Sequence, residues 1–376
     1  MSNLEVSMVQ FAQDLIRIPS LSGREDEIAT RVTQEMERLN YDDVRVDEVG
    51  NVLGVIRGQE SGPGWLLLSH LDHVDVGNHE EWPHPPYGAV IEEGRLYGRG
   101  AVDIKGSLAA QVYGAITVKP RRSVLVAAMV KEEIGGIGAA HFTRHLDMDV
   151  GLCLVGEPSQ NSLMIGHRGV ARFPVRFRGV AHHAGFARSQ DNPHFALAEF
   201  LVRLRDAALP SHPVLGSSSI APTVMNADTA SGNLTPNVTR IILDWRTSSE
   251  SETEMRCMMA RLTEGLPAEY AVPPLWTTGP TGMHLPGFYT EPDHIAVQQI
   301  QRTLEQVLHH PASPGLWSFS TDGRYTHAQG IMTLGLGPGD PALAHTTAEF
   351  VAITELLDYT RVLSSMLSQT PASFGM

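Results

Sequence analysis

The sequence is poor in cysteine, has fewer basic than acidic residues and contains no long apolar run. Its two cysteines, Cys153 and Cys257, cannot supply a disulfide framework, which is compatible with a reducing compartment. The 28 lysines and arginines are outnumbered by 42 aspartates and glutamates, and this net charge of −14 argues against nucleic acid or an anionic membrane as a partner. No apolar run approaches the ~18 residues of a membrane span. Glu5 and Asp14 precede the first basic residue, Arg17, which is unlike a signal peptide. We therefore expect a soluble, cytoplasmic protein.

The 376 residues are enough for a full core and predict two or three domains. Short apolar runs at 65–68, 123–130 and 151–155 are typical of buried strands, and a helical pattern at 105–116 lies between two of them. Strands that alternate with helices predict βαβ units and a mostly parallel sheet. Near the C-terminus we expect a helix over 295–308, a buried strand over 331–336 and a long helix over 349–367.

The pattern changes near residue 173. Apolar residues alternate with polar ones over 173–177 and 241–245, as in strands with one wet face, and helical periodicity follows each strand. This block predicts a small α+β domain inserted into the first domain. We therefore expect an α/β catalytic domain built from 1–173 and 285–376, with an inserted α+β domain over 174–284.

Histidines and carboxylates follow the predicted buried strands. Because the carboxyl ends of parallel strands meet at one edge of a sheet, where ligands bind, we expect these side chains to converge. Asp103 lies in a glycine-rich turn just before a predicted helix. The strand-end residues are His70 and Asp72 after 65–68, Glu132 and Glu133 after 123–130, Glu157 after 151–155 and His345 after 331–336.

Imidazoles and carboxylates at one edge suit zinc, cobalt or manganese, and a carboxylate shared by two ions makes a two-metal hydrolytic site. Of the neighbours Glu132 and Glu133, one can bind metal while the other acts as general base. Asp72 can hold the second imidazole nitrogen of His70. A single histidine or carboxylate at a strand end is most often only a solvated loop residue.

His141 and His145 have i,i+4 spacing and could bind metal, but without an HExxH order we favour a surface helix.

Several motifs, taken together, resemble those of one family. Residues 69–77 (SHLDHVDVG) are similar to an H-x-D-x-V-x-x-G motif, and 94–106 (GRLYGRGAVDIKG) form a long and specific string. Residues 131–136 (KEEIGG) and 156–159 (GEPS) follow in order, and Gly337-Pro338-Gly339 precedes His345 and Glu349. This order resembles the M20 family of metallopeptidases and aminoacylases, which includes acetylornithine deacetylase, succinyl-diaminopimelate desuccinylase and carboxypeptidase G2.

The resemblance implies two divalent metal ions, zinc first, with cobalt or manganese possible. Asp103 would bridge the two ions. The other ligands would be His70 and Glu157 for one ion and Glu133 and His345 for the other.

The resemblance also implies catalytic roles for two further carboxylates. Asp72 would orient His70. Glu132, as general base, would take a proton from a water bridging the metals and hand it to the leaving amine.

Members of the family pair through the inserted domain, which serves as both lid and dimer interface, so the resemblance implies a homodimer. A histidine from the partner's lid completes the oxyanion site; counting from Gly179 this is His183, although its neighbour His182 leaves the choice open. Asn233, Arg246 and Arg324 resemble substrate-binding residues, and an arginine fork suits a substrate carboxylate. Asn233 as a turn cap and Arg246 as half of a surface ion pair remain alternatives.

The expected function is therefore hydrolysis of an N-acyl amino acid, of the acetyl or succinyl type, by a two-metal enzyme. A dipeptidase or carboxypeptidase acting on short peptides is the alternative. A non-catalytic binding relative is disfavoured because the ligand and base positions are all filled. The roles of His73 and Asp75, which depart from the family pattern, stay open.

Overall fold

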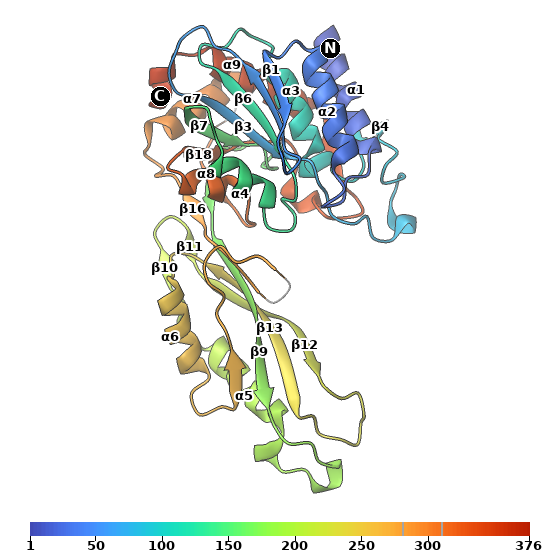
Figure 1. Cartoon of the computed structure of the whole chain (residues 1–376), viewed down its shortest axis with the longest axis vertical. Helices are drawn as coiled ribbons and strands as arrows, with labels where there is room; N and C mark the ends of the chain where they lie inside the picture. The colour runs from blue at the N-terminus through green and yellow to red at the C-terminus, as the bar shows by residue number, and fades with distance from the viewer. Residues whose placement is uncertain (280–281, 310) are drawn as a thin grey trace. The chain divides into compact units, whose positions relative to one another are not determined.

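Two separate cores organise the chain, and Figure 1 shows the elements that build each of them. The computed structural model describes residues 1–279, 282–309 and 311–376. The first unit comprises residues 1–166, 289–317 and 321–376, and the second unit comprises 167–288 and 318–320. The second unit includes the whole of strand β9 (Gly169–Arg178), so it begins a few residues before position 174.

The first unit contains most of the secondary structure. Its helices are α1 (Asn3–Arg17), α2 (Asp26–Arg38), α3 (Gly106–Gly114), α4 (Ile137–Arg144), α7 (Ile295–Leu308), α8 (Gly323–Ala328) and α9 (Ile353–Ser368). Its strands are β1 (Asp43–Val46), β2 (Val52–Ile56), β3 (Gly64–His70), β4 (Val90–Glu92), β5 (Arg95–Tyr97), β6 (Val124–Met129), β7 (Val150–Val155), β17 (Gly315–Trp317), β18 (Met332–Gly335) and β19 (Phe350–Ala352). Strands β8 (Met164–His167) and β16 (Phe288–Tyr289) lie where the chain passes between the units.

A mostly parallel sheet forms the centre of the first unit, as the sequence predicts. Strands β6, β3, β7 and β18 are neighbours in this order, and each neighbouring pair is parallel. All residues of β3 and β6 are buried, which is why both strands are continuous apolar runs rather than alternating ones. The predicted α/β fold is therefore confirmed.

Helices cover both faces of this sheet. On one face the Ser69 hydroxyl of β3 donates to Gln111 of α3, 2.7 Å away. On the other face the hydroxyls of Thr326 in α8 and Thr333 in β18 lie 2.9 Å apart. Buried polar pairs at these positions fix the helices over the sheet because an unpaired hydroxyl there would be costly.

The predicted helix over 349–367 is wrong at its start. Residues Phe350–Ala352 form β19, which pairs with β5 in antiparallel register, and α9 begins only at Ile353. The Phe350 ring packs against Tyr97 with 5.3 Å between ring centroids, and the Arg95 guanidinium lies 4.7 Å from the same ring. These cross-strand contacts outweigh the helical pattern of the following residues.

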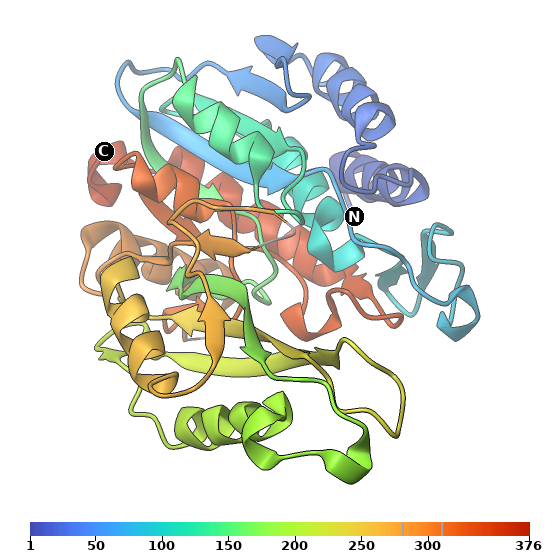
Figure 2. The ribbon, with the colours of Figure 1, turned by 60° about the horizontal axis from the view of Figure 1, so that its bottom comes forward.

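The second unit has its own antiparallel sheet with two helices on one face, which Figure 2 shows from below. Its sheet order is β12-β13-β9-β14, and β15 also pairs with β9. Phe173, Phe177 and Trp245 point to the helices and are fully buried, while Arg172 and Arg176 alternate on the other face. The sequence β-α-β-β-α-β with this order is the ferredoxin-like arrangement. The elements are α5 (Pro193–Arg205), α6 (Glu252–Leu262), β9, β10 (Ser211–His212), β11 (Gly216–Ser217), β12 (Ser219–Ala227), β13 (Val238–Thr247), β14 (Ala268–Tyr270) and β15 (Met283–Leu285).

In the described part of the chain, no helix combines the length and the apolar character that crossing a membrane requires.

Candidate metal centre

The carboxyl ends of the parallel strands bring the candidate residues together. His70 is the last residue of β3, Glu132 and Glu133 follow β6, and Glu157 follows β7. Two groups of side chains each place their ligand atoms within 4.8 Å of one another: His70, Glu132 and Glu157, and His70, Asp103 and Glu133. The topology alone explains this convergence, because these strands are adjacent and parallel.

Asp103 lies between two imidazoles. Its Oδ1 is 2.9 Å from Nε2 of His70, and its Oδ2 is 3.1 Å from Nε2 of His345. The segment that carries Asp103 begins after Gly100, whose φ of 82° is the left-handed conformation that glycine adopts readily. Asp103 therefore presents one oxygen to each side of the centre.

His345 completes one side of the centre. Its Nε2 lies 3.0 Å from Oε1 of Glu133, and its side chain is 49% exposed, far more than that of His70. The residue has a φ of 63°, a left-handed conformation that is uncommon for a side chain other than glycine. On the other side, Oε1 of Glu157 lies 3.7 Å from Nε2 of His70.

Asp72 connects His70 to the loop of Glu132 and Glu133. Nδ1 of His70 lies 2.9 Å from the backbone oxygen of Asp72 and 3.5 Å from its carboxylate. Both carboxylate oxygens accept backbone N–H groups, from Glu132 at 3.0 Å and from Glu133 at 3.2 Å, and Ser22 adds a hydroxyl at 2.6 Å. The imidazole is thus held mainly by the backbone carbonyl, and the carboxylate mainly shapes the loop.

Glu349 supports Asp103 from behind, a position to which the sequence assigned no role. One of its oxygens accepts the backbone N–H groups of Val102 and Asp103, at 3.0 and 3.3 Å, and the other pairs with Arg99 at 2.6 Å. Burial raises the pKa of Glu349 to about 7, against the attraction of Arg99. In the sequence, Glu349 is marked only by its place after Gly337-Pro338-Gly339 and His345. No spacing rule identifies a residue that supports a ligand in this way.

Buried carboxyl groups dominate the electrostatics of the centre. Burial raises the pKa of Glu132 and Glu157 well above the usual range, and like charges add to the shift, from Asp322 at Glu132 and from Asp103 at Glu157. Burial also raises the pKa of Glu133. Hydrogen bonds to Asp103 and Glu133 raise the pKa of His345 to about 10. Positive charge beside the carboxyl groups would therefore favour their ionised forms.

These residues fit a pair of divalent metal ions. The donor set consists of imidazole nitrogens and carboxylate oxygens, which zinc, cobalt and manganese all accept. The raised carboxyl pKa values show that burial disfavours the ionised forms, and bound cations would favour them.

Arg324 lies in the first unit beside the Glu132–Glu133 loop. It is 2% exposed, donates to the backbone oxygen of Thr321 at 2.7 Å and pairs with Asp322 at 3.3 Å. Gly136 makes this approach possible, since a Cβ there would lie 2.1 Å from Oδ1 of Asp322. The guanidinium stacks on Tyr325, whose hydroxyl donates to the oxygen of Gly135.

The remaining predicted substrate residues lie in the second unit. His183 and Leu234, the neighbour of Asn233, form a β-bridge, and the backbone N–H of Ala184 donates to the oxygen of Asn233 at 2.8 Å. Arg246 donates to Asp244 at 2.7 Å, and Arg172 shares the same carboxylate. The surface ion pair left open for Arg246 is therefore present. His182 pairs instead with Asp191, at 3.2 Å.

Two residues left open by the sequence are structural. His73 is buried, accepts the N–H of Ser20 at 2.9 Å and contacts the oxygen of Val74 at 2.7 Å. Burial and the charge of Lys105 lower its pKa to about 4, so the ring is neutral near pH 7. Asp75 accepts the N–H of Gly77 in a turn.

Known proteins resemble the chain over nearly its whole length. It is 26% identical over 364 residues to the uncharacterized protein YgeY of Escherichia coli K12, covering 92% of this chain and 90% of YgeY. Two solved structures share its fold. The M20 family metallo-carboxypeptidase Sso-CP2 from Sulfolobus solfataricus has a TM-score of 0.75 at 15% identity, covering 98% of this chain and 99% of its own. The YXEP protein of Bacillus subtilis, a dinuclear metal-binding peptidase of the M20 family, has a TM-score of 0.70 at 15% identity and 97% coverage of both chains.

The family model described as Peptidase family M20/M25/M40 matches residues 66–369, which include every candidate residue of the metal centre. The resemblance drawn from the motifs is thereby confirmed. The chain belongs to peptidase family M20/M25/M40 and is a metal-dependent hydrolase of amide bonds.

Proposed function

We propose that the chain removes an N-acyl group, of the acetyl or succinyl type, from an amino acid. The observation that carries the two-metal hydrolysis in this proposal is Asp103, whose two oxygens lie 2.9 and 3.1 Å from the imidazoles of His70 and His345. A carboxylate in this position is suited to bridge two metal ions about 3.5–4 Å apart, as two-metal hydrolases require.

In this proposal His70, Asp103 and Glu157 would hold one ion, and Asp103, Glu133 and His345 would hold the other. Zinc is the proposed metal, with cobalt or manganese as alternatives. When bound, the ions would polarise the carbonyl of the substrate and lower the pKa of a water molecule.

Glu132 is the proposed general base. Its carboxylate takes a proton from the water, whose oxygen attacks the amide carbonyl carbon, and hands the proton to the leaving nitrogen as the C–N bond breaks. Burial and the charges of Asp322 and Glu157 raise the pKa of Glu132, which suits a group that must accept and release a proton. Asp72 holds the backbone of this loop in place.

Arginines are the proposed partners of the substrate carboxylate. Arg324 is nearly fully buried beside the loop of Glu132, where its low exposure would strengthen an ion pair with a carboxylate. Arg246 and Asn233 of the second unit are further proposed contacts. We assign stabilisation of the oxyanion to His183 of the partner subunit, with His182 as the less favoured choice because it pairs with Asp191.

A dipeptidase or carboxypeptidase is the alternative function, and one observation favours it. Sso-CP2, a metallo-carboxypeptidase, shares the fold over 98% of this chain. Both activities break an amide bond beside a free carboxylate, so they need the same centre and differ in the acyl side of the substrate.

We also propose that the protein is cytoplasmic. Cys153 and Cys257 are free thiols, which is compatible with a reducing compartment.

We also propose a homodimer formed through the second unit. Strand β12 is an edge strand of its sheet, and Val224 and Met225 on it are 54% and 57% exposed. Adjacent exposed apolar side chains on an edge strand are typical of contact surfaces between chains.

Replacing Asp72 by asparagine should weaken metal binding. Asparagine keeps one acceptor oxygen and replaces the other by an NH2 group, so it cannot accept the N–H groups of both Glu132 and Glu133, and we expect about 10–100-fold lower metal affinity. Competition with a zinc chelator measures this change. Asp75→Asn is the matched control because the side chain of Asp75 accepts the N–H of Gly77 in a turn and no N–H of the Glu132–Glu133 loop. Equal affinities for the two variants would contradict the role of Asp72.

Glu132→Gln should abolish turnover and leave the metals in place. Glutamine has the same shape but cannot take a proton, so we expect kcat to fall by a factor of about 10²–10⁴. Elemental analysis should find the same metal content as in the parent. Glu80→Gln, at an exposed position of the short 3-10 helix His79–Glu81, is the control with unchanged kcat. A Glu132→Gln enzyme of parental activity would remove the base assignment.

A hydrolysis screen of the metal-loaded enzyme tests the substrate class. Protein stripped and reloaded with zinc, cobalt or manganese is offered N-acetyl and N-succinyl amino acids and dipeptides, and free amine is measured. We expect cleavage of one acyl series. Cleavage of dipeptides alone would replace the proposal by the peptidase alternative, and full metal loading without any turnover would point to the non-catalytic relative.

Sedimentation velocity tests the dimer. We expect twice the chain mass of 40.9 kDa for the parent and a shift towards monomer for Val224→Lys, because a buried ammonium would be costly. The control Val46→Lys changes a valine of similar exposure (50%) on edge strand β1 of the first unit. A monomeric parent, or a dimer unaffected by Val224→Lys, would refute this interface.

A further inference from the structure

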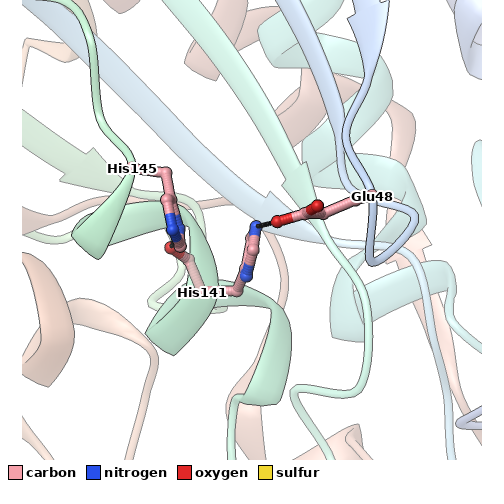
Figure 3. A group of neighbouring side chains, drawn as sticks. All are labelled: Glu48, His141 and His145. Carbon is pink, nitrogen blue, oxygen red and sulfur yellow. Dashed lines mark hydrogen bonds and ion pairs between the residues drawn. The ribbon is translucent and has the colours of Figure 1, made fainter.

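Two histidines and a glutamate meet on the surface of the first unit, and none of them is a candidate ligand of the metal centre. His141 lies in α4, His145 caps the same helix one turn later, and Glu48 projects from the turn between β1 and β2 (Figure 3). Nε2 of His141 lies 3.3 Å from Oε1 of Glu48, and the two imidazoles stack with 4.2 Å between ring centroids. One ligand atom from each of the three residues lies within 4.8 Å of the others.

The backbone that carries these side chains is held in place by buried hydrogen bonds. Asp47 accepts the N–H groups of Val49, Gly50 and Asn51 and so closes the turn that presents Glu48. Asn51, which is fully buried, donates to the oxygen of Gly138 in α4 at 3.0 Å and to Asp47 at 2.7 Å. The turn and the helix are therefore tied to each other, which favours a preformed site.

The hydrogen bonding of His145 fixes the nitrogen that is available. Its Nδ1 lies 2.9 Å from the backbone oxygen of His141, and because a carbonyl only accepts, Nδ1 carries the proton. The lone pair is then on Nε2. Metal-binding histidines commonly make this arrangement, with the other ring nitrogen donating to a backbone carbonyl.

The charge around the three residues favours a cation. They line a cleft of about 300 Å³ whose other charged residues are Asp47, Asp147 and Arg45. The Arg45 guanidinium is already paired with Asp147 at 2.6 Å, so its charge is compensated. Glu48 is 75% exposed and can turn towards the imidazoles without breaking a buried contact.

We propose that Glu48, His141 and His145 form a third metal site, which takes zinc through two imidazole nitrogens and one carboxylate oxygen. Zinc binds such ligands at about 2.0–2.2 Å in a tetrahedral arrangement, and solvent fills the fourth position. The ion would fasten the turn of Glu48 to α4, the helix that directly follows the loop of Glu132 and Glu133.

Counting bound zinc tests the site. The parent and His145→Ala are dialysed to equilibrium against the same buffered, micromolar free zinc, and zinc per chain is measured by elemental analysis. We expect one zinc fewer in His145→Ala, whatever the occupancy of the dinuclear centre. His84→Ala is the matched control, since His84 also pairs with a glutamate, Glu92, at 3.2 Å but through a single imidazole. It should keep the parental zinc content.

Residue-level labelling provides a second readout on the parent alone. Diethyl pyrocarbonate modifies accessible imidazoles, and mass spectrometry locates the modified residues. Zinc should lower modification of His141 and His145 several-fold and leave that of His84 unchanged. Equal zinc contents in the parent and His145→Ala, an equal loss in His84→Ala, or labelling that zinc does not change would each overturn the proposal.

Discussion

The burial of several carboxylates beside one another is the constraint on which the first unit depends. Removing ionised groups from water costs several kcal/mol each unless opposite charge compensates them. Here burial raises the pKa values of Glu132, Glu133 and Glu157 together, while Asp103 stays strongly acidic because hydrogen bonds with His345 and His70 outweigh its burial. The folded chain thus gathers at one sheet edge carboxyl groups that ionise unfavourably without nearby positive charge, and divalent metal ions would supply that charge.

This constraint explains why so many residues around the centre serve the backbone rather than the substrate. Glu349 holds the N–H groups of Val102 and Asp103, and Asp72 holds those of Glu132 and Glu133. Each supporting carboxylate fixes the segment that carries a candidate ligand. Ligand positions are then set by the fold before a metal arrives, which lowers the cost of ordering them on binding.

Much of this could be predicted from the sequence, because the relevant signals are local. Continuous apolar runs identified β3, β6 and β7, and the residues that follow them identified the candidate ligands. What escaped prediction depends on contacts between distant segments. Residues 350–352 are helical by pattern but pair with β5, and Glu349 reaches Arg99 across 250 positions of the chain. For Arg246, the sequence left a substrate contact and an ion pair open, and the structure shows the ion pair with Asp244, two positions away.

His70 of the metal centre and His145 beside Glu48 differ in burial, and this difference separates their chemistry. His70 is 2% exposed, and a metal bound to it would lie in a region of low dielectric where charge on the substrate is strongly stabilised. His145 and Glu48 are exposed, so an ion there would keep contact with solvent and would gain little from its surroundings. We therefore expect the ligands around His70 to serve catalysis. We expect those around Glu48 to join a turn to a helix.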